Sequence, residues 1–100
     1  MKSKTKFKFR LYVASNTPNA AKAMVNLRQF CREHLAGRHV IEVVDVFKNP
    51  KRALADQIYM TPLLLRLAPK PLRRVVGTLD QAQALLAALG VTSAAGFKAV

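Results

Sequence analysis

The stretch from Lys6 to Asn19 constrains this chain most, because it passes from a strand pattern to a helix start within a few residues. Apolar side chains occupy alternate positions in its first part: Phe7, Phe9, Leu11 and Val13. Such alternation predicts a strand with one apolar face, while Lys6, Lys8, Arg10 and Tyr12 lie on the other. Thr17 then suits a helix N-cap and Pro18 the first helical position. Many α/β proteins place functional groups at a strand-to-helix turn of this kind.

The next segments predict a βαβ unit. Residues 18–36 form a helix, since apolar residues recur three or four positions apart: Ala20, Met24, Leu27, Cys31 and Leu35. Gly37 ends this helix. Residues 39–47 form a strand that is nearly continuous in β-branched residues, which is typical of a strand covered on both faces. Strand, helix and strand in this order predict a right-handed parallel crossover.

The second half completes the pattern. Asn49 and Pro50 start a helix over residues 50–59, whose inner face is Ala53, Leu54 and Ile58. Residues 63–67 and 72–76 flank a proline-containing turn and favour a hairpin, although the first segment also suits a helix. Asp80 caps a last helix over residues 81–89, which Gly90 ends; its apolar face is Ala82, Leu85, Leu86 and Leu89.

The element order is therefore β-α-β-α-β-β-α, with helices on both faces of the sheet. This arrangement is α/β and thioredoxin-like. We expect residues 1–90 to form a single domain and residues 91–100 to form a C-terminal tail.

Charge narrows the range of partners. The formal net charge is +12 over 100 residues, which favours an anionic partner: nucleic acid, an anionic membrane surface or an acidic protein face. The alternative is that the cations form a solvated face that only keeps the protein soluble. No apolar run approaches the ~20 residues that a membrane span needs, so we expect no membrane insertion. One cysteine cannot form an internal disulfide, which fits a cytoplasmic location.

The sequence argues against catalysis. Thioredoxin-like redox enzymes need two thiols at the first strand-to-helix turn, and the corresponding positions here are Asn16 and Asn19. Cys31 lies on the apolar face of its helix, where a buried, unreactive thiol is expected. His34 and His39 lack a spaced third metal ligand. With no glycine-rich phosphate loop either, we expect no enzyme activity, no cofactor and no metal.

Several motifs together resemble the KaiB family of bacterial circadian clock proteins. They lie in order and at the family spacing, without gaps, over about residues 7–90. They are Leu11-Tyr12-Val13-Ala14, Asn16-Thr17-Pro18-Asn19, Val44-Asp45-Val46-Phe47-Lys48-Asn49-Pro50, Asp56, Ile58, Thr61-Pro62, Pro69, Pro71, Arg73-Arg74 and Gly77.

The resemblance implies a non-enzymatic protein that binds the ATPase ring of KaiC. In cyanobacteria the complex sequesters KaiA and displaces an output kinase. It also implies two folds: a thioredoxin-like form that binds KaiC, and a tetramer whose second half packs differently. A homo-oligomer, either a dimer or a tetramer, is a further expectation. The partner-binding residues carried over are Lys22, Lys48, Asn49, Pro50, Arg52, Asp56, Arg73 and Arg74.

This sequence also departs from the family pattern. Leu54 and Ala55 replace adjacent acids, Ser15 stands where glycine is usual, and Lys70 replaces the middle of three prolines. These changes leave open whether the chain serves a true clock or a simpler timing or stress system linked to a KaiC-like protein. Two other functions stay open: a redox-inactive thioredoxin-like adaptor, and a basic nucleic-acid-binding module, for which no recognition motif is present.

Four of the five X-Pro bonds lie at Pro50 and beyond. Since X-Pro bonds change isomer slowly, we expect the second half of the chain to be the part that can adopt two conformations.

Overall fold

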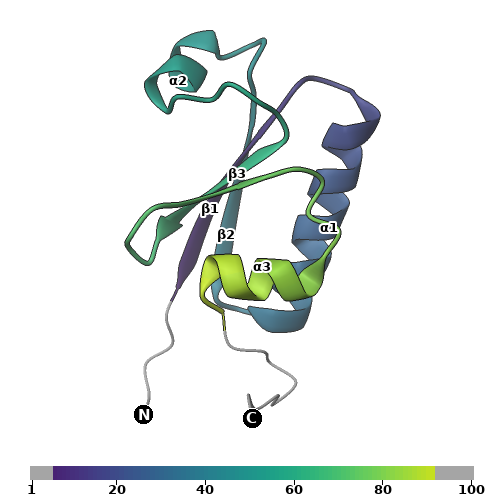
Figure 1. Cartoon of the computed structure of the whole chain (residues 1–100), viewed down its shortest axis with the longest axis vertical. Coiled ribbons are helices and arrows are strands. Elements are labelled where there is room, and N and C mark those ends of the chain that lie inside the picture. The colour runs from purple at the N-terminus through teal and green to yellow at the C-terminus, as the bar shows by residue number, and fades with distance from the viewer. Residues whose placement is uncertain (1–5, 92–100) are drawn as a thin grey trace.

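The computed structural model describes residues 6–91, which form a mixed sheet with three helices (Figure 1). The predicted order of elements is confirmed, and the predicted boundaries lie within two residues of the observed ones except at the end of α2. The elements are β1 (Phe7–Val13), α1 (Pro18–His34), β2 (His39–Asp45), α2 (Pro50–Ala55), β3 (Leu63–Ala68), β4 (Arg73–Val76) and α3 (Ala82–Leu89). The predicted tail lies almost wholly outside the described residues.

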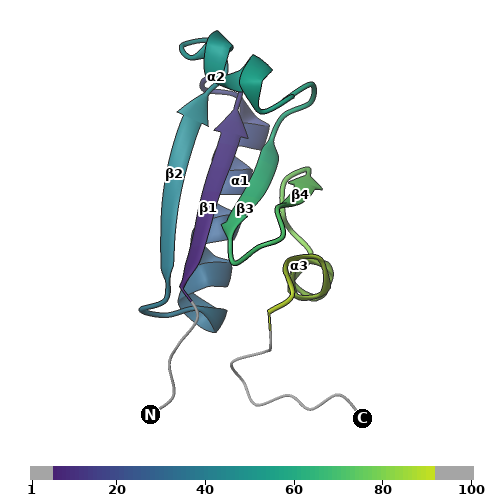
Figure 2. The same cartoon turned by 90° about the vertical axis from the view of Figure 1, so that its left-hand side faces the viewer.

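The sheet has the strand order β2-β1-β3-β4 (Figure 2). β1 is central and pairs in parallel with β2 and antiparallel with β3, while β4 pairs antiparallel with β3. Thr17 caps α1 by accepting a hydrogen bond from the Ala20 N–H at 3.2 Å, and Pro18 occupies the first turn, as predicted. The thioredoxin-like α/β fold expected from the sequence is therefore present.

The two faces of the sheet bury different cores. Phe9 and Leu11 of β1 pack with Leu27 and Cys31 of α1 and with Leu85 of α3. On the opposite face, a smaller core joins the sheet to α2 and consists of Tyr12, Val44, Ala53, Ile58, Leu63 and Leu65. Figure 1 shows α1 on one side of the sheet and α2 at the upper end of the other. The alternation of residues 6–13 predicted this division correctly.

The prediction that β2 is covered on both faces is wrong. β2 lies at the edge of the sheet, where Val40 and Val43 are 49% and 37% exposed and only Val44 is fully buried. A run of β-branched residues favours a strand, but it does not determine how many neighbours that strand has.

Helix α2 ends at Ala55 instead of residue 59. Gln57 takes a left-handed backbone conformation with a φ of 59°, and the N–H groups of Gln57 and Ile58 donate to the carbonyls of Leu54 and Ala53. This pair of hydrogen bonds forms a Schellman motif, which ends the helix and packs Ile58 against Ala53. The motif turns Leu54 outward, where it is 69% exposed, so the prediction that it faces the core is wrong.

The predicted cap of α3 is also wrong. Gln81, rather than Asp80, occupies the N-cap position, and no side chain caps this end. Ala82 is exposed, so the buried face of α3 is carried by Leu85 and Leu89, with Leu86 partly buried. Gly90 adopts a left-handed conformation with a φ of 67° and ends the helix, as predicted.

Candidate protein-binding surface

The turn that leads into α2 is fastened by the carboxylate of Asp45, at the end of β2. Asp45 accepts hydrogen bonds from the Ser15 N–H at 3.3 Å, the Ser15 hydroxyl at 2.9 Å and the Phe47 N–H at 2.9 Å. Burial of this carboxyl opposes its ionisation, but the bonds from Phe47 and Ser15 outweigh it and lower the pKa of Asp45. The β1–α1 and β2–α2 turns are thus joined at the carboxyl edge of the parallel strands.

Ser15 occupies a backbone position that suits glycine. Its φ is 44°, in the left-handed region where a side chain is disfavoured. The two hydrogen bonds from Ser15 to Asp45 hold the residue in this conformation. The replacement of the usual glycine noted in the sequence therefore comes with a contact that only a polar side chain can make.

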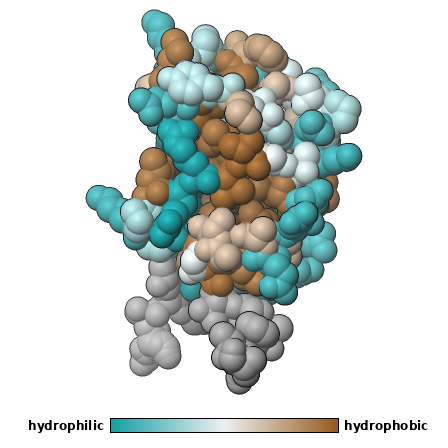
Figure 3. Space-filling model, in the orientation of Figure 1, coloured by the Kyte–Doolittle hydropathy of each residue, from teal (hydrophilic) through white to brown (hydrophobic). Residues whose placement is uncertain are grey.

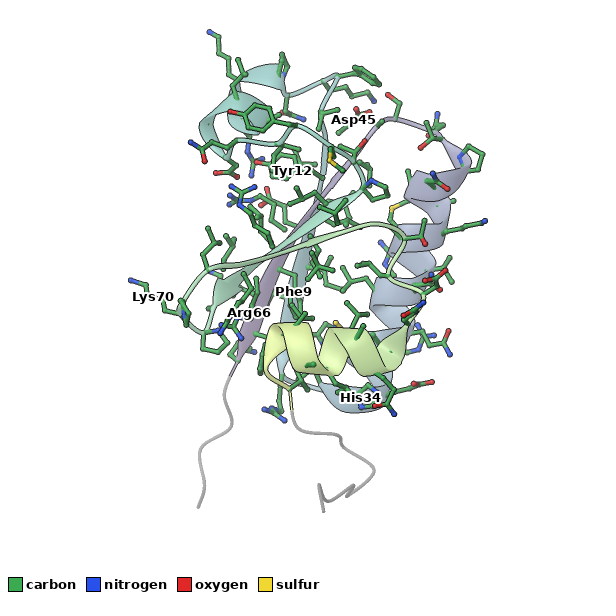
Figure 4. All side chains as sticks on the ribbon, viewed as in Figure 1. Phe9, Tyr12, His34, Asp45, Arg66 and Lys70 are labelled. Carbon is green, nitrogen blue, oxygen red and sulfur yellow. The ribbon has the colours of Figure 1, made fainter. Side chains whose placement is uncertain are left out.

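An ionic network fastens α2 to the sheet. Arg10 of β1 donates from Nε to Glu42 at 2.8 Å and from Nη1 to Asp56 at 3.0 Å. The Tyr12 hydroxyl lies 2.5 Å from the same Asp56 oxygen. Figure 4 shows Tyr12 below α2, on the side of β1 that faces it. Because Asp56 is the C-cap of α2, these contacts fix where the helix ends.

Two predicted residues complete this network. Arg52 of α2 lies 2.8 Å from Glu42 of β2. Arg74 of β4 donates to the backbone carbonyls of Asp56 and, at 3.2 Å, of Gln57. Cations at the carboxyl end of a helix interact favourably with its free carbonyl groups. The structure therefore brings Arg52, Asp56 and Arg74 together, with contacts from β1, β2 and β4.

The network shifts the pKa values of its members. Burial opposes ionisation of Asp56, but hydrogen bonds from Tyr12 and Arg10 outweigh it and lower the pKa of that carboxyl. Hydrogen bonds from Arg10 and Arg52 lower the pKa of Glu42. Burial, followed by the bond to Asp56, raises the pKa of Tyr12. Both carboxylates are therefore ionised at neutral pH and are bound by groups of their own chain.

The other predicted residues take different places. Lys48, Asn49 and Pro50 lie at the start of α2. Asn49 occupies the N-cap position, but its side chain makes no capping bond and donates to the Asp45 carbonyl instead. Lys22 is exposed on α1. Arg73 pairs in register with Arg66, whose guanidinium reaches α3, so Arg73 belongs to the face of the sheet opposite α2.

Large apolar side chains are exposed around α2. Phe47, Leu54, Tyr59 and Met60 are 70%, 69%, 78% and 59% exposed, and all lie within residues 47–60. In Figure 3, hydrophobic and hydrophilic residues are mixed at the end of the molecule that carries α2. We call the set formed by Phe47, Lys48, Lys51, Arg52, Leu54, Tyr59 and Met60 the α2 surface. Sequence analysis missed its apolar members, since apolar residues near a short helix are ordinarily assigned to the core.

The α2 surface is suited to binding a macromolecule. Apolar residues exposed together mark interaction sites more often than isolated ones do. Within residues 6–91, no three His, Cys, Asp or Glu side chains lie close enough to hold a metal ion, and no helix could cross a membrane. The thiol of Cys31 is buried, which raises its pKa to about 12 and suppresses the reactive thiolate.

Comparison with protein families identifies relatives over most of the chain. A model of the KaiB domain matches residues 10–91. The circadian clock oscillator protein KaiB of Prochlorococcus marinus (strain MIT 9313) is 41% identical over 80 residues, which cover 80% of this chain and 67% of the relative. KaiB of Microcystis aeruginosa is 37% identical over 86 residues, covering 86% of this chain and 83% of the relative. The resemblance found in the sequence motifs is confirmed.

Solved structures show the same fold at low identity. The N-terminal domain of SasA from Synechococcus elongatus has a TM-score of 0.72 at 18% identity, covering 90% of this chain and 89% of that one. Thioredoxin from Fasciola hepatica has a TM-score of 0.69 at 11% identity, covering 87% and 82% of the two chains.

Proposed function

The chain belongs to the KaiB family of circadian clock proteins, and from this premise we propose that it is a non-enzymatic regulator that binds the ATPase ring of a KaiC-like protein. The system it serves is a circadian clock or a related timing or stress system. The α2 surface carries this proposal, because it exposes Leu54 on a helix that the ionic network holds in place, with Phe47, Tyr59 and Met60 exposed in the segments that flank it.

The proposal assigns separate roles to the predicted residues. Lys48 lies on the α2 surface and contacts the ring, whereas Arg52 of the same surface has its guanidinium paired to Glu42 and supports that contact. Asp56 and Arg74 position α2, since their charged groups point to β1 and to the end of the helix. Asn49 and Pro50 set where α2 starts. The ion pair with Arg10 and the bond with Tyr12 make Asp56 a poor probe of binding, since replacing it would also loosen the helix.

Two predicted cations, Lys22 and Arg73, lie outside the α2 surface. We propose them as charged supports that interact with the ring at longer range. Electrostatic attraction of this kind raises the association rate more than the lifetime of a complex.

The remaining proposals concern the state of the free chain. Residues 1–90 act as one domain followed by a tail, in the cytoplasm, where the lone buried thiol of Cys31 stays reduced. Self-association as a dimer or a tetramer is the family-based expectation. Light scattering coupled to size-exclusion chromatography measures the mass of the free chain and tests the oligomeric state.

Sedimentation of a labelled chain with the KaiC-like ATPase ring tests the proposed function. We expect saturable co-sedimentation with the ring when the ring is loaded with nucleotide. A labelled chain that sediments alone at every ring concentration would contradict the proposal. That result would leave the chain as a redox-inactive thioredoxin-like adaptor for another protein, or as a basic module for nucleic acid.

A further inference from the structure

The charges on the α2 surface are of one sign. Lys48 and Lys51 are exposed, and neither forms a close ion pair with a carboxylate among residues 6–91, although Lys48 attracts the Asp45 carboxylate at longer range. The three acids nearest in the fold are all engaged by their own chain: Glu42 by Arg10 and Arg52, Asp45 by Ser15 and Phe47, and Asp56 by Arg10 and Tyr12. The surface therefore offers cations and no free carboxylate to a partner.

The apolar members of the α2 surface lie among these cations. Leu54 and Lys51 both belong to α2, one turn apart, and Phe47 immediately precedes Lys48. Protein interfaces commonly consist of an apolar centre that excludes water and a charged or polar rim. Carboxylates placed at the rim of a partner would pair with the lysines while apolar groups cover Leu54.

We infer, resting on the proposed function, that the α2 surface recognises an acidic protein face with an apolar centre. Carboxylates of the partner lie against Lys48 and Lys51, and an apolar recess accepts Leu54. This assigns a charge to the docking face of the KaiC-like ring. The apolar side chains of Leu54 and Ala55 suit such a partner, because an acid at either position would repel it.

Nucleic acid is the competing anionic partner, and the observations favour protein. Phosphate contacts are made by cations and by hydrogen-bond donors, and they gain nothing from exposed leucine or methionine. Moreover, the guanidinium groups of Arg10, Arg52 and Arg74, which would be the natural phosphate ligands, are already bound inside the network. The two lysines of the α2 surface that remain available to a partner, Lys48 and Lys51, are interleaved with apolar residues.

The test compares Lys51→Glu with Arg28→Glu in binding to the nucleotide-loaded KaiC-like ring. Arg28 is exposed on α1, so both variants change the charge equally. Glutamate is favourable in the first turn of a helix, so Lys51→Glu leaves α2 folded. We expect Lys51→Glu to weaken binding at least about fivefold and Arg28→Glu less than about twofold. The affinity of the unaltered chain for the ring should decrease when the NaCl concentration is raised from about 50 to about 300 mM, because salt screens the charges.

Equal affinity of the Lys51→Glu variant and the unaltered chain would overturn the inference while leaving the proposed function in place. If the ring fails to bind the unaltered chain, the proposed function fails, and a second measurement decides the inference. A synthetic peptide that alternates Glu with Leu is titrated into the labelled chain by NMR, beside the same peptide with Lys in place of Glu.

Shifts confined to residues 47–60 and caused only by the Glu peptide would support the inference. Equal shifts from both peptides, shifts elsewhere, or no shifts would overturn it. Duplex DNA that displaces the Glu peptide from these residues would also overturn it, because the surface would then be assigned to nucleic acid.

Discussion

The hydroxyl group of Tyr12 lies 2.5 Å from a carboxylate oxygen of Asp56, so the central strand and the residue that ends α2 are directly bonded. The same oxygen is 3.0 Å from the guanidinium of Arg10. Two residues of β1 therefore converge on one carboxylate across a sequence separation of more than forty positions. This contact decides where the α2 surface is held relative to the sheet.

Tyr12→Phe tests the contribution of this bond to stability. A hydrogen bond to a charged group contributes about 1.5–3 kcal/mol, so we expect the variant to lose roughly that amount of unfolding free energy in urea titrations. Tyr59→Phe is the matched control, because Tyr59 is 78% exposed and should not change stability. Equal stabilities of the two variants would show that the Tyr12 hydroxyl contributes nothing.

Stability should decrease in acid because the pKa of Asp56 is lowered from its ordinary value of 3.8. A carboxylate whose pKa is lower in the folded state than in the unfolded state stabilises the protein fully at any pH above its unfolded-state pKa. This contribution is lost as the pH falls through the folded-state pKa. We expect the melting temperature of Asp56→Asn to approach that of the unaltered chain as the pH falls below about 4. Asp80→Asn, at an exposed position, should show no such convergence.

Arg66→Ala should loosen the second half of the fold. The guanidinium of Arg66, which is 4% exposed, donates to the Leu89 carbonyl at 2.5 Å and to the Pro71 carbonyl at 2.7 Å, and so joins α3 to the β3–β4 turn. Losing these bonds and the buried side-chain volume should cost at least about 2 kcal/mol. Arg73→Ala, at the neighbouring exposed position, should cost less than about 0.5 kcal/mol. Amide exchange in α3 distinguishes local loosening from a global loss.

The thiol of Cys31 should not react in the folded protein. Burial raises its pKa to about 12, so almost no thiolate is present at neutral pH. We expect a disulfide reagent to modify Cys31 only as fast as the chain unfolds, with rapid modification in concentrated urea as the control. Rapid reaction of the native chain would contradict the buried position.

Much of the fold could be predicted because its signals are local. The alternation of Phe7 with its neighbours, the cap at Thr17 and the stop at Gly90 each act within a few residues, and each is observed. The order of strands is not local, so the edge position of β2 and the exposure of Val40 could not be read from the sequence.

The candidate site was predicted only in part for the same reason. Family motifs pointed to Arg52 and Asp56, but the partners of these residues come from β1 and β2, which are distant in sequence. Apolar spacing in a helix as short as α2 cannot tell which side faces outward, which is why the predicted core position of Leu54 is wrong. The alternative packing of residues 50–90 that the resemblance implies stays a prediction.

The most direct test of the proposed function is the affinity of Leu54→Asp for the nucleotide-loaded KaiC-like ring, measured beside Val25→Asp. Both side chains are large, apolar and exposed, at 69% and 62%, but Val25 lies on α1, away from the α2 surface. We predict that Leu54→Asp weakens binding at least about tenfold while Val25→Asp binds as the unaltered chain does. Unchanged binding by Leu54→Asp, or equal losses in both variants, would contradict docking through α2.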